Sequence, residues 1–489
     1  MRTSEIRSLE AWTLFAIYTL AHGAIFFISE SIFWDDWTIS GTKPEDILTT
    51  FKQAGAFMEI TPVLHILLLP VGVWSYRALT FFLIFLSGIV FYKIITRFFW
   101  VDSSCRFLVT ALYLITPLYS ARVALIDFPY TFSMFIFLLG WLLIGRVRLL
   151  SLAFFFISFN TASLLVFYAL PILDWYYRVH RGLNWKEITS FVNKRLDYIA
   201  LPFVFFAIKN IFFSPYGLYK GYNQGFSLRY LVTTPVIQAR DLFQLELSVG
   251  LIFVSLFAAW ALIKLVSRET IVGPISERLV GCCYRKNIYV GAGLLSIFLG
   301  VFPYWILGHP PTFLEWTSRH QLLMPFGTAF FTVGLICCLK QEYQKSFLLL
   351  MVSFALAINW QNYYWFYVDS KKQELLIDWL SKSSVVNSAD LVIFDDKTRK
   401  ALSRKPRFYE WNGLLLAALP ESDGKFGLSL EDMDTYKSGG FDKYFGREYK
   451  AEHHTRSGTN RCALVEISGT AFRYHFEAKD VGMCLGEIR

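Results

Sequence analysis

Long apolar segments alternate with short polar ones over the first three quarters of the chain. A helix needs about 20 predominantly apolar residues to cross a bilayer, and several segments approach or reach that length. The pattern predicts a polytopic α-helical membrane protein with about eleven transmembrane helices. The predicted spans are Ala11–Ile28, Leu79–Trp100, Phe107–Ser120, Phe128–Ile144, Leu149–Phe159, Leu164–Tyr177, Tyr198–Phe213, Glu246–Leu265, Ile288–Leu307, Leu322–Leu339 and Phe347–Tyr367.

One further apolar stretch, Ile60–Trp74, is predicted to stay outside the membrane. It is short and is interrupted by Pro62 and Pro70, and proline disrupts a continuous helix. We assign it to outer juxtamembrane helices within residues 31–77. With this stretch left out of the count, Lys and Arg concentrate in the loops on the N-terminal side of the membrane. That asymmetry obeys the positive-inside rule and predicts a cytoplasmic N-terminus.

The pattern changes at Asp369, where the sequence becomes polar. A helical pattern at Gln373–Leu380 and strand-like runs at Leu391–Phe394 and Ala463–Ile467 predict a small soluble α/β or α+β domain. We therefore divide the chain into a transmembrane domain, residues 1–368, and a periplasmic soluble domain, residues 369–489. In an oxidising compartment Cys462 and Cys484 are predicted to form a disulfide; the alternative is two free thiols.

Composition and charge support this class of protein. Hydrophobic residues make up 55% of the 489 residues and charged residues 17%, against roughly 45–50% and 25% in soluble domains. The formal net charge of +9 comes from dispersed residues beside apolar segments, so no nucleic-acid partner is needed to explain it. The sequence has no Asn-X-Ser/Thr acceptor, which favours a bacterial inner membrane over a eukaryotic secretory one.

The most distinctive polar motif is Trp34-Asp35-Asp36-Trp37, directly after the first predicted span. Carboxylates at a membrane are costly and tend to be functional, and tryptophans favour the membrane–water interface. The alternative is a solvated loop in which Asp36 caps a short helix. Trp34, Trp37 and Trp316 are also candidates for stacking on a sugar.

The predicted topology places other polar side chains on the same outer face, namely His65, Arg122, Asp127, Arg319 and His320. Nucleotide sugars are absent from that side of a bacterial membrane, so chemistry there requires a lipid-linked substrate. A carboxylate suits the role of general base, and an arginine suits binding of a leaving phosphate. Asp395-Asp396, after a strand-like run, is interpreted as a solvated strand end, with a second acidic site as the alternative.

The order of these motifs resembles the GT-C superfamily of integral membrane glycosyltransferases, which includes the protein O-mannosyltransferases and the lipid A aminoarabinose transferases. The resemblance covers about residues 1–340 and depends on four features. These are the acidic pair Asp35-Asp36, the run from Thr61 to His65 leading to Tyr76-Arg77, Asp127 with Arg122 nearby, and Arg319-His320 ahead of Pro325. Asn160-Thr161 stands where many bacterial members have Thr-Lys.

The resemblance implies a glycosyltransferase that uses a polyprenyl-phosphate sugar donor, with inversion, and a glycan, lipid or protein acceptor. Asp35 or Asp36 would act as the base and Arg319 as the phosphate ligand, with membrane lipids around the chain. Further substrate-binding candidates are His320, Asp127, Arg122, His65, Arg77 and Trp37. Some members use a divalent cation near the acidic pair and others do not, and the motif does not decide between them; if an ion is used, Mg²⁺ or Mn²⁺ would be bound by Asp35, Asp36 and Asp127. The alternatives are a lipid-linked-sugar transporter or flippase and a non-catalytic cell-envelope assembly protein.

Overall fold

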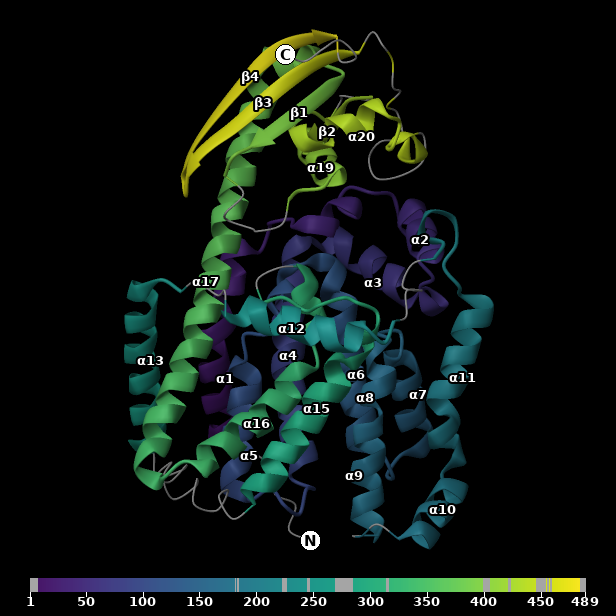
Figure 1. Cartoon of the computed structure of the whole chain (residues 1–489), viewed down its shortest axis with the longest axis vertical. Helices are drawn as coiled ribbons and strands as arrows, with labels where there is room; N and C mark the ends of the chain where they lie inside the picture. The colour runs from purple at the N-terminus through teal and green to yellow at the C-terminus, as the bar shows by residue number, and fades with distance from the viewer. Residues whose placement is uncertain are drawn as a thin grey trace.

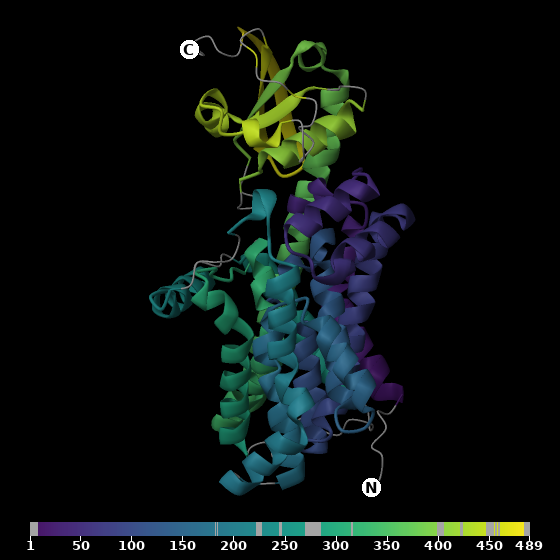
Figure 2. The ribbon, with the colours of Figure 1, turned by 90° about the vertical axis from the view of Figure 1, so that its right-hand side faces the viewer.

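The computed structural model describes residues 8–180, 182, 184–221, 227–243, 247–268, 285–313, 316–398, 405–420, 424–445, 454, 457 and 460–483. They form a long helical bundle that carries a small sheet domain at one end (Figure 1). Helix α1 (Ser8–His22) begins at the opposite end, and the view turned by 90° shows the same arrangement (Figure 2). The predicted topology, with a cytoplasmic N-terminus and an outer C-terminal domain, requires these two parts of the chain to lie at opposite ends of the bundle.

Five helical segments are long and apolar enough to cross a membrane, and each coincides with a predicted span. They are Leu9–Ile28 in α1 and η1 (Gly23–Ile28), Val73–Ile95 (α4), Leu125–Leu143 in η6 (Leu125–Asp127) and α6 (Phe128–Leu143), Val249–Val266 in α13 (Val249–Arg268), and Lys286–Ile306 (α15). Several other predicted spans are shorter apolar helices, namely α5 (Ser103–Ile115), α7 (Arg148–Ser158) and α16 (Met324–Cys338). The membrane class is supported, whereas the count of eleven spans stays a prediction.

Two predicted segments differ in detail. Leu164–Tyr177 is divided into α8 (Ser163–Phe167) and α9 (Ala169–His180), because Pro171 lacks the amide hydrogen needed inside a helix and is tolerated only in a first turn. Ile60–Trp74 forms the short helix α3 (Ile60–Leu68) and the 3₁₀ turn η4 (Leu69–Val71). It lies with α2 (Pro44–Gln53) below the sheet domain (Figure 1). The remaining helices of the bundle are α10 (Trp185–Lys194), α11 (Leu196–Phe212) and α12 (Tyr230–Phe243).

A single helix joins the two parts of the chain. Helix α17 (Gln341–Lys382) has 42 residues, which corresponds to about 63 Å at 1.5 Å per residue. It includes both the last predicted span and the helix predicted at Gln373–Leu380. The change of composition at Asp369 therefore falls within a continuous helix, with no linker between the parts (Figure 1).

The C-terminal domain is a four-stranded sheet with strand order β2-β1-β3-β4. Strand β1 (Leu391–Asp396) pairs in parallel with β2 (Phe426–Ser429) and β3 (Arg461–Thr470), and β3 pairs antiparallel with β4 (Arg473–Met483). Helix α19 (Phe408–Ala418) packs on the sheet, accompanied by α18 (Ser384–Ser388) and α20 (Met433–Lys437). The predicted strands in β1 and β3 are confirmed. Cys462, buried on β3, is a disulfide cysteine, and its predicted partner Cys484 lies outside the described residues.

Candidate functional site

The acidic motif forms the short 3₁₀ helix η2 (Trp34–Thr38) at the end of the bundle that faces the sheet domain. Asp36 is fully buried, and each of its carboxylate oxygens accepts a backbone hydrogen bond. Oδ2 accepts from the Phe33 amide at 3.3 Å and Oδ1 from the Ile126 amide at 3.0 Å. The second bond ties η2 to η6, although 90 residues separate them in sequence. Asp36 thereby fixes the position of the loop that carries Asp127.

Burial raises the pKa of Asp36 to about 7, because the charged form loses solvation, and the amides of Ile126 and Leu125 offset only part of that cost. A buried carboxylate usually needs ionic or hydrogen-bonding partners to stay ionised. The pKa therefore lies near neutral pH. The two backbone hydrogen bonds to the carboxylate are nevertheless those of a structural group.

Asp127 lies at the end of η6, directly before α6, whose first turn contains Pro129. The side chain is buried, and neither carboxylate oxygen has a hydrogen-bond partner among the described residues. Its strongest interaction with another charge is with Arg319, and the carboxylates of Asp36 and Asp35 also act on it. Buried polar groups are nearly always hydrogen-bonded. The two open acceptor atoms beside an arginine are therefore the expected features of a ligand-binding position.

Arg319 belongs to η8 (Trp316–Gln321), which packs against η5 (Ser120–Val123). Ser318 Oγ is 2.8 Å from Ser120 Oγ and accepts a 2.8 Å hydrogen bond from the Ala121 amide. The guanidinium of Arg319 lies 4.0 Å from the centre of the Trp316 ring. Its Nε also donates a 3.4 Å hydrogen bond to Nε2 of His320, and a cation held over an indole face in this way is oriented.

His320 follows Arg319 and stacks on Tyr304, with 4.2 Å between the ring centres. Burial, reinforced by the positive charge of Arg319, lowers the pKa of His320 well below its usual value. The imidazole is therefore neutral at physiological pH. Its Nδ1 atom is buried with no hydrogen-bond partner among the described residues.

Asp35 contacts the C-terminal domain. Its Oδ1 accepts a hydrogen bond from the hydroxyl of Tyr409 and lies 3.7 Å from Nη1 of Arg407. Arg407 also donates a 2.8 Å hydrogen bond to the Tyr409 hydroxyl. Both residues belong to the start of α19, so the soluble domain directly contacts the acidic motif.

Trp37 belongs to the hydrophobic core of the C-terminal domain together with Leu376, Trp411 and Leu414. It packs so closely on Gly413 of α19 that a Cβ at that glycine would lie 2.3 Å from Cε3 of the indole. The sequence interpretation missed Arg407, Tyr409 and Gly413. No local pattern marks them, because their importance comes from a contact across 374 residues of sequence.

Three predicted site residues make other contacts. Arg122 donates to the carbonyls of Tyr119 and Thr116, and its Nη1 faces the ring nitrogens of His22 at 3.3 Å. His65 stacks on Phe51 and its Nδ1 is 3.2 Å from the Tyr76 hydroxyl.

Arg77 donates to the carbonyls of Ser29 and Ser31 and lies over the Phe33 ring. The outer polar residues therefore do not all meet in one place. Asp36, Asp127, Arg319 and His320 lie near one another, and Asp35 contacts the C-terminal domain. Arg122, His65 and Arg77 stabilise the surrounding segments.

The carboxylates do not form a metal site in the part of the chain that the structure describes. No three His, Cys, Asp or Glu side chains there come close enough to bind a metal ion together. Both oxygens of Asp36 already accept amide hydrogen bonds, and Mg²⁺ demands near-octahedral oxygen coordination. As the structure places them, Asp35, Asp36 and Asp127 therefore do not form a three-carboxylate site, and no step below uses a metal ion.

Comparison of the chain with known protein families, curated proteins and solved structures finds no match.

Proposed function

We propose that this chain is a membrane glycosyltransferase that takes a sugar from a polyprenyl-phosphate donor and transfers it to an acceptor hydroxyl on the outer face. The observation that carries the proposal is the pair of unpartnered carboxylate oxygens on buried Asp127 beside Arg319. A sugar phosphate suits this pair of residues, since its hydroxyls donate to a carboxylate and its phosphate binds a guanidinium. The resemblance of the motif order to GT-C enzymes points in the same direction.

In the proposed reaction the acceptor hydroxyl attacks the anomeric carbon of the donor sugar. A new C–O bond forms while the bond from that carbon to the phosphate oxygen breaks. The bonding electron pair leaves with the polyprenyl phosphate, and Arg319 stabilises the added charge. A carboxylate takes the proton of the acceptor hydroxyl.

Asp35 is the better candidate for the base. A general base must reach the hydrogen of the attacking hydroxyl, and Asp35 Oδ1 already accepts a hydrogen bond from a hydroxyl, that of Tyr409. Asp36 is fully buried, with both oxygens bound by amides of its own surroundings. We therefore assign proton transfer to Asp35, and we assign to Asp36 the positioning of Asp127.

The test is a transfer assay with the purified full chain, radiolabelled polyprenyl-phosphate sugars and a mixture of cell-envelope glycans, lipids and proteins as acceptors. Asp35→Asn should lower the rate by about 10²–10⁴-fold. Arg319→Ala should lower it by about 10²–10³-fold, and Asp127→Asn should raise KM for the donor. Asp46→Asn is the matched control, because Asp46 is an exposed acid on α2 in the same outer region.

Transfer that survives all three substitutions would disprove the proposed mechanism. Movement of an intact lipid-linked sugar across vesicles, without bond cleavage, would identify a transporter. Absence of both activities in folded protein would favour the assembly role.

A further inference from the structure

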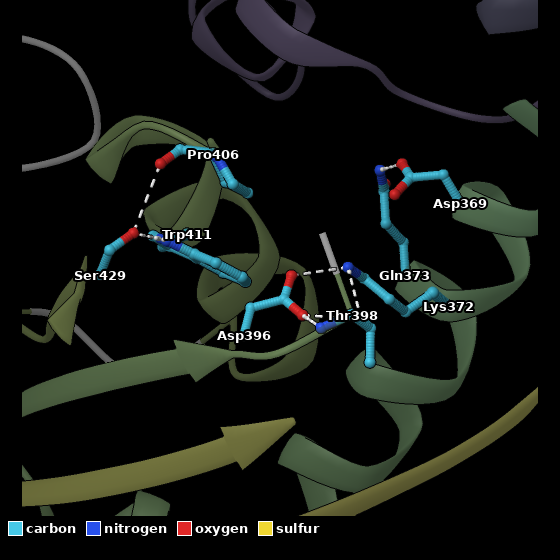
Figure 3. A network of polar contacts seen from close by, with 8 residues as sticks. All are labelled: Asp369, Lys372, Gln373, Asp396, Thr398, Pro406, Trp411 and Ser429. Carbon is cyan, nitrogen blue, oxygen red and sulfur yellow. Dashed lines mark hydrogen bonds and ion pairs between the residues drawn. The ribbon is translucent and has the colours of Figure 1, made fainter. Parts of the chain in front are cut away.

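A cleft lies between the acidic motif and the C-terminal domain, and both parts of the chain line it. Trp34 and Trp37 come from η2, and the opposite wall comes from α17, β1 and α19. Figure 3 shows the polar side chains of that wall, with the ring of Trp411 beside Asp396 and Lys372. The polar residues of this wall are Asp369, Lys372, Gln373, Asp396 and Glu410.

The charges in this wall are organised into pairs. Lys372 Nζ lies 2.7 Å from Asp396 Oδ2 and 3.3 Å from Thr398 Oγ1, and Gln373 donates to Asp369 at 2.7 Å (Figure 3). Asp396 is buried, so its interpretation as a solvated strand end was wrong. Asp396 is the last residue of β1, which lies between β2 and β3 in the sheet. Ligands of open parallel sheets bind at the carboxyl end of such a strand.

Trp34 carries independent signs of a ligand-binding position. Its φ is +54°, a left-handed conformation that is strained for a bulky side chain and that clusters at functional sites. The side chain is 3% exposed, and its indole N–H has no hydrogen-bond partner among the described residues. Trp34 also packs on Trp316, which holds Arg319, with 5.8 Å between the ring centres. The cleft therefore adjoins the proposed phosphate site.

We propose that this interdomain cleft binds a sugar ring of the acceptor, so that the acceptor is a glycan rather than a protein or an apolar lipid. The inference rests on the proposed function and names its acceptor class. Indole faces, carboxylates and an amide are suited to sugars, which present C–H faces to aromatic rings and hydroxyls to polar atoms. The unpartnered N–H of Trp34 would donate to a sugar oxygen.

The cleft is narrow in this structure, with a cavity volume of about 40 Å³, which leaves room for only a few water molecules and too little for a sugar ring. A sugar enters only when α19 moves away from η2, which separates Tyr409 from Asp35. The acceptor hydroxyl then takes the place of the Tyr409 hydroxyl on Asp35 Oδ1. Binding of the acceptor and release of the base are therefore one event.

The experiment measures sugar binding without requiring turnover. Saturation-transfer NMR on the full chain in detergent would use glucose, galactose, mannose, xylose and N-acetylglucosamine as probes. At least one sugar should receive saturation. Its affinity should fall about tenfold in Trp34→Phe, which keeps the ring and removes the N–H, and similarly in Gln373→Ala. Trp185→Phe is the control, since Trp185 is 76% exposed and lies on α10.

Tyr409→Phe should bind the same sugar about tenfold more tightly, because opening then breaks one hydrogen bond fewer. The inference is overturned if none of the five sugars receives saturation, or if both cleft variants bind like the wild type. Sugar binding without any transfer would instead refute the proposed function and keep the cleft. Transfer to proteins or lipids alone would overturn the acceptor assignment.

Discussion

The contact between Gly413 and Trp37 allows a sharp test of how the two parts of the chain fit together. Replacing Gly413 with alanine places a Cβ 2.3 Å from Cε3, 2.7 Å from Cδ2 and 3.0 Å from Cγ of the indole. Carbon atoms attract best at about 3.5–4.0 Å. Trp37 is 5% exposed and embedded in the domain core, so its rigid ring cannot move aside.

The cost follows from two opposing effects. In the helix α19, alanine is more favourable than glycine by about 1 kcal/mol. Overpacking of the added methyl group against Trp37 costs about 1–3 kcal/mol. Moving α19 off η2 relieves the overlap but gives up the hydrogen bond from Tyr409 to Asp35, which contributes about 1.5–3 kcal/mol. We expect the contact to weaken by about 2 kcal/mol, a roughly 30-fold shift toward the open form.

Hydrogen–deuterium exchange of residues 31–40 measures this opening, because the C-terminal domain covers η2. Exchange there should rise in Gly413→Ala, and the interior of the bundle should be unchanged. Gly291→Ala is the matched control, since Gly291 lies within α15 and a Cβ there meets no atom within 4 Å. If Gly413→Ala exchanges in this segment like Gly291→Ala, the proposed packing of α19 on the acidic motif is wrong.

Three further predictions follow from buried charges. Lys372→Met should destabilise the folded chain by about 3–5 kcal/mol in chemical denaturation, because it leaves the buried Asp396 carboxylate without its ionic partner. The double variant Lys372→Met/Asp396→Leu should recover most of that loss. Equal stability of the single and double variants would contradict this prediction. Asp36 has a folded pKa raised from 3.8 to about 7. Wild-type stability should therefore decline relative to Asp36→Asn as pH rises from 4 to 7, by about 3 kcal/mol in total, and flat pH profiles in thermal unfolding would argue against it. Arg77→Lys keeps the charge but loses the fork that binds the carbonyls of Ser29 and Ser31. It should lower the transfer rate at least tenfold with donor KM little changed, and wild-type kinetics would exclude a role in placing η2.

The sequence pattern predicted the features that depend on local composition. Apolar length identified five helices that are long and apolar enough to cross a membrane, and Pro62 and Pro70 marked a separate short helix that precedes α4. Polar composition identified the C-terminal domain and its β1 and β3 strands. These properties depend on hydrophobic period and proline geometry, which the chain carries locally.

Contacts between residues that are far apart in the sequence could not be predicted from local patterns. Asp396 resembles a solvated strand end until Lys372, 24 residues away, is found to pair with it inside the protein. Likewise, the pair Asp35-Asp36 is chemically symmetric in the sequence. Only the fold distinguishes Asp36, bound by the amide of Ile126, from Asp35, bound by Tyr409.

Helix α17 makes the sheet domain mechanically dependent on the bundle. Lys372 fastens the domain to this helix, while η2, the other side of the cleft, belongs to the bundle. Over its length of about 63 Å, a tilt of roughly 5° at the base of α17 would displace the far end by about 5 Å. The angle at which α17 leaves the bundle thus sets the width of the gap above the acidic motif, because one continuous helix carries the sheet domain.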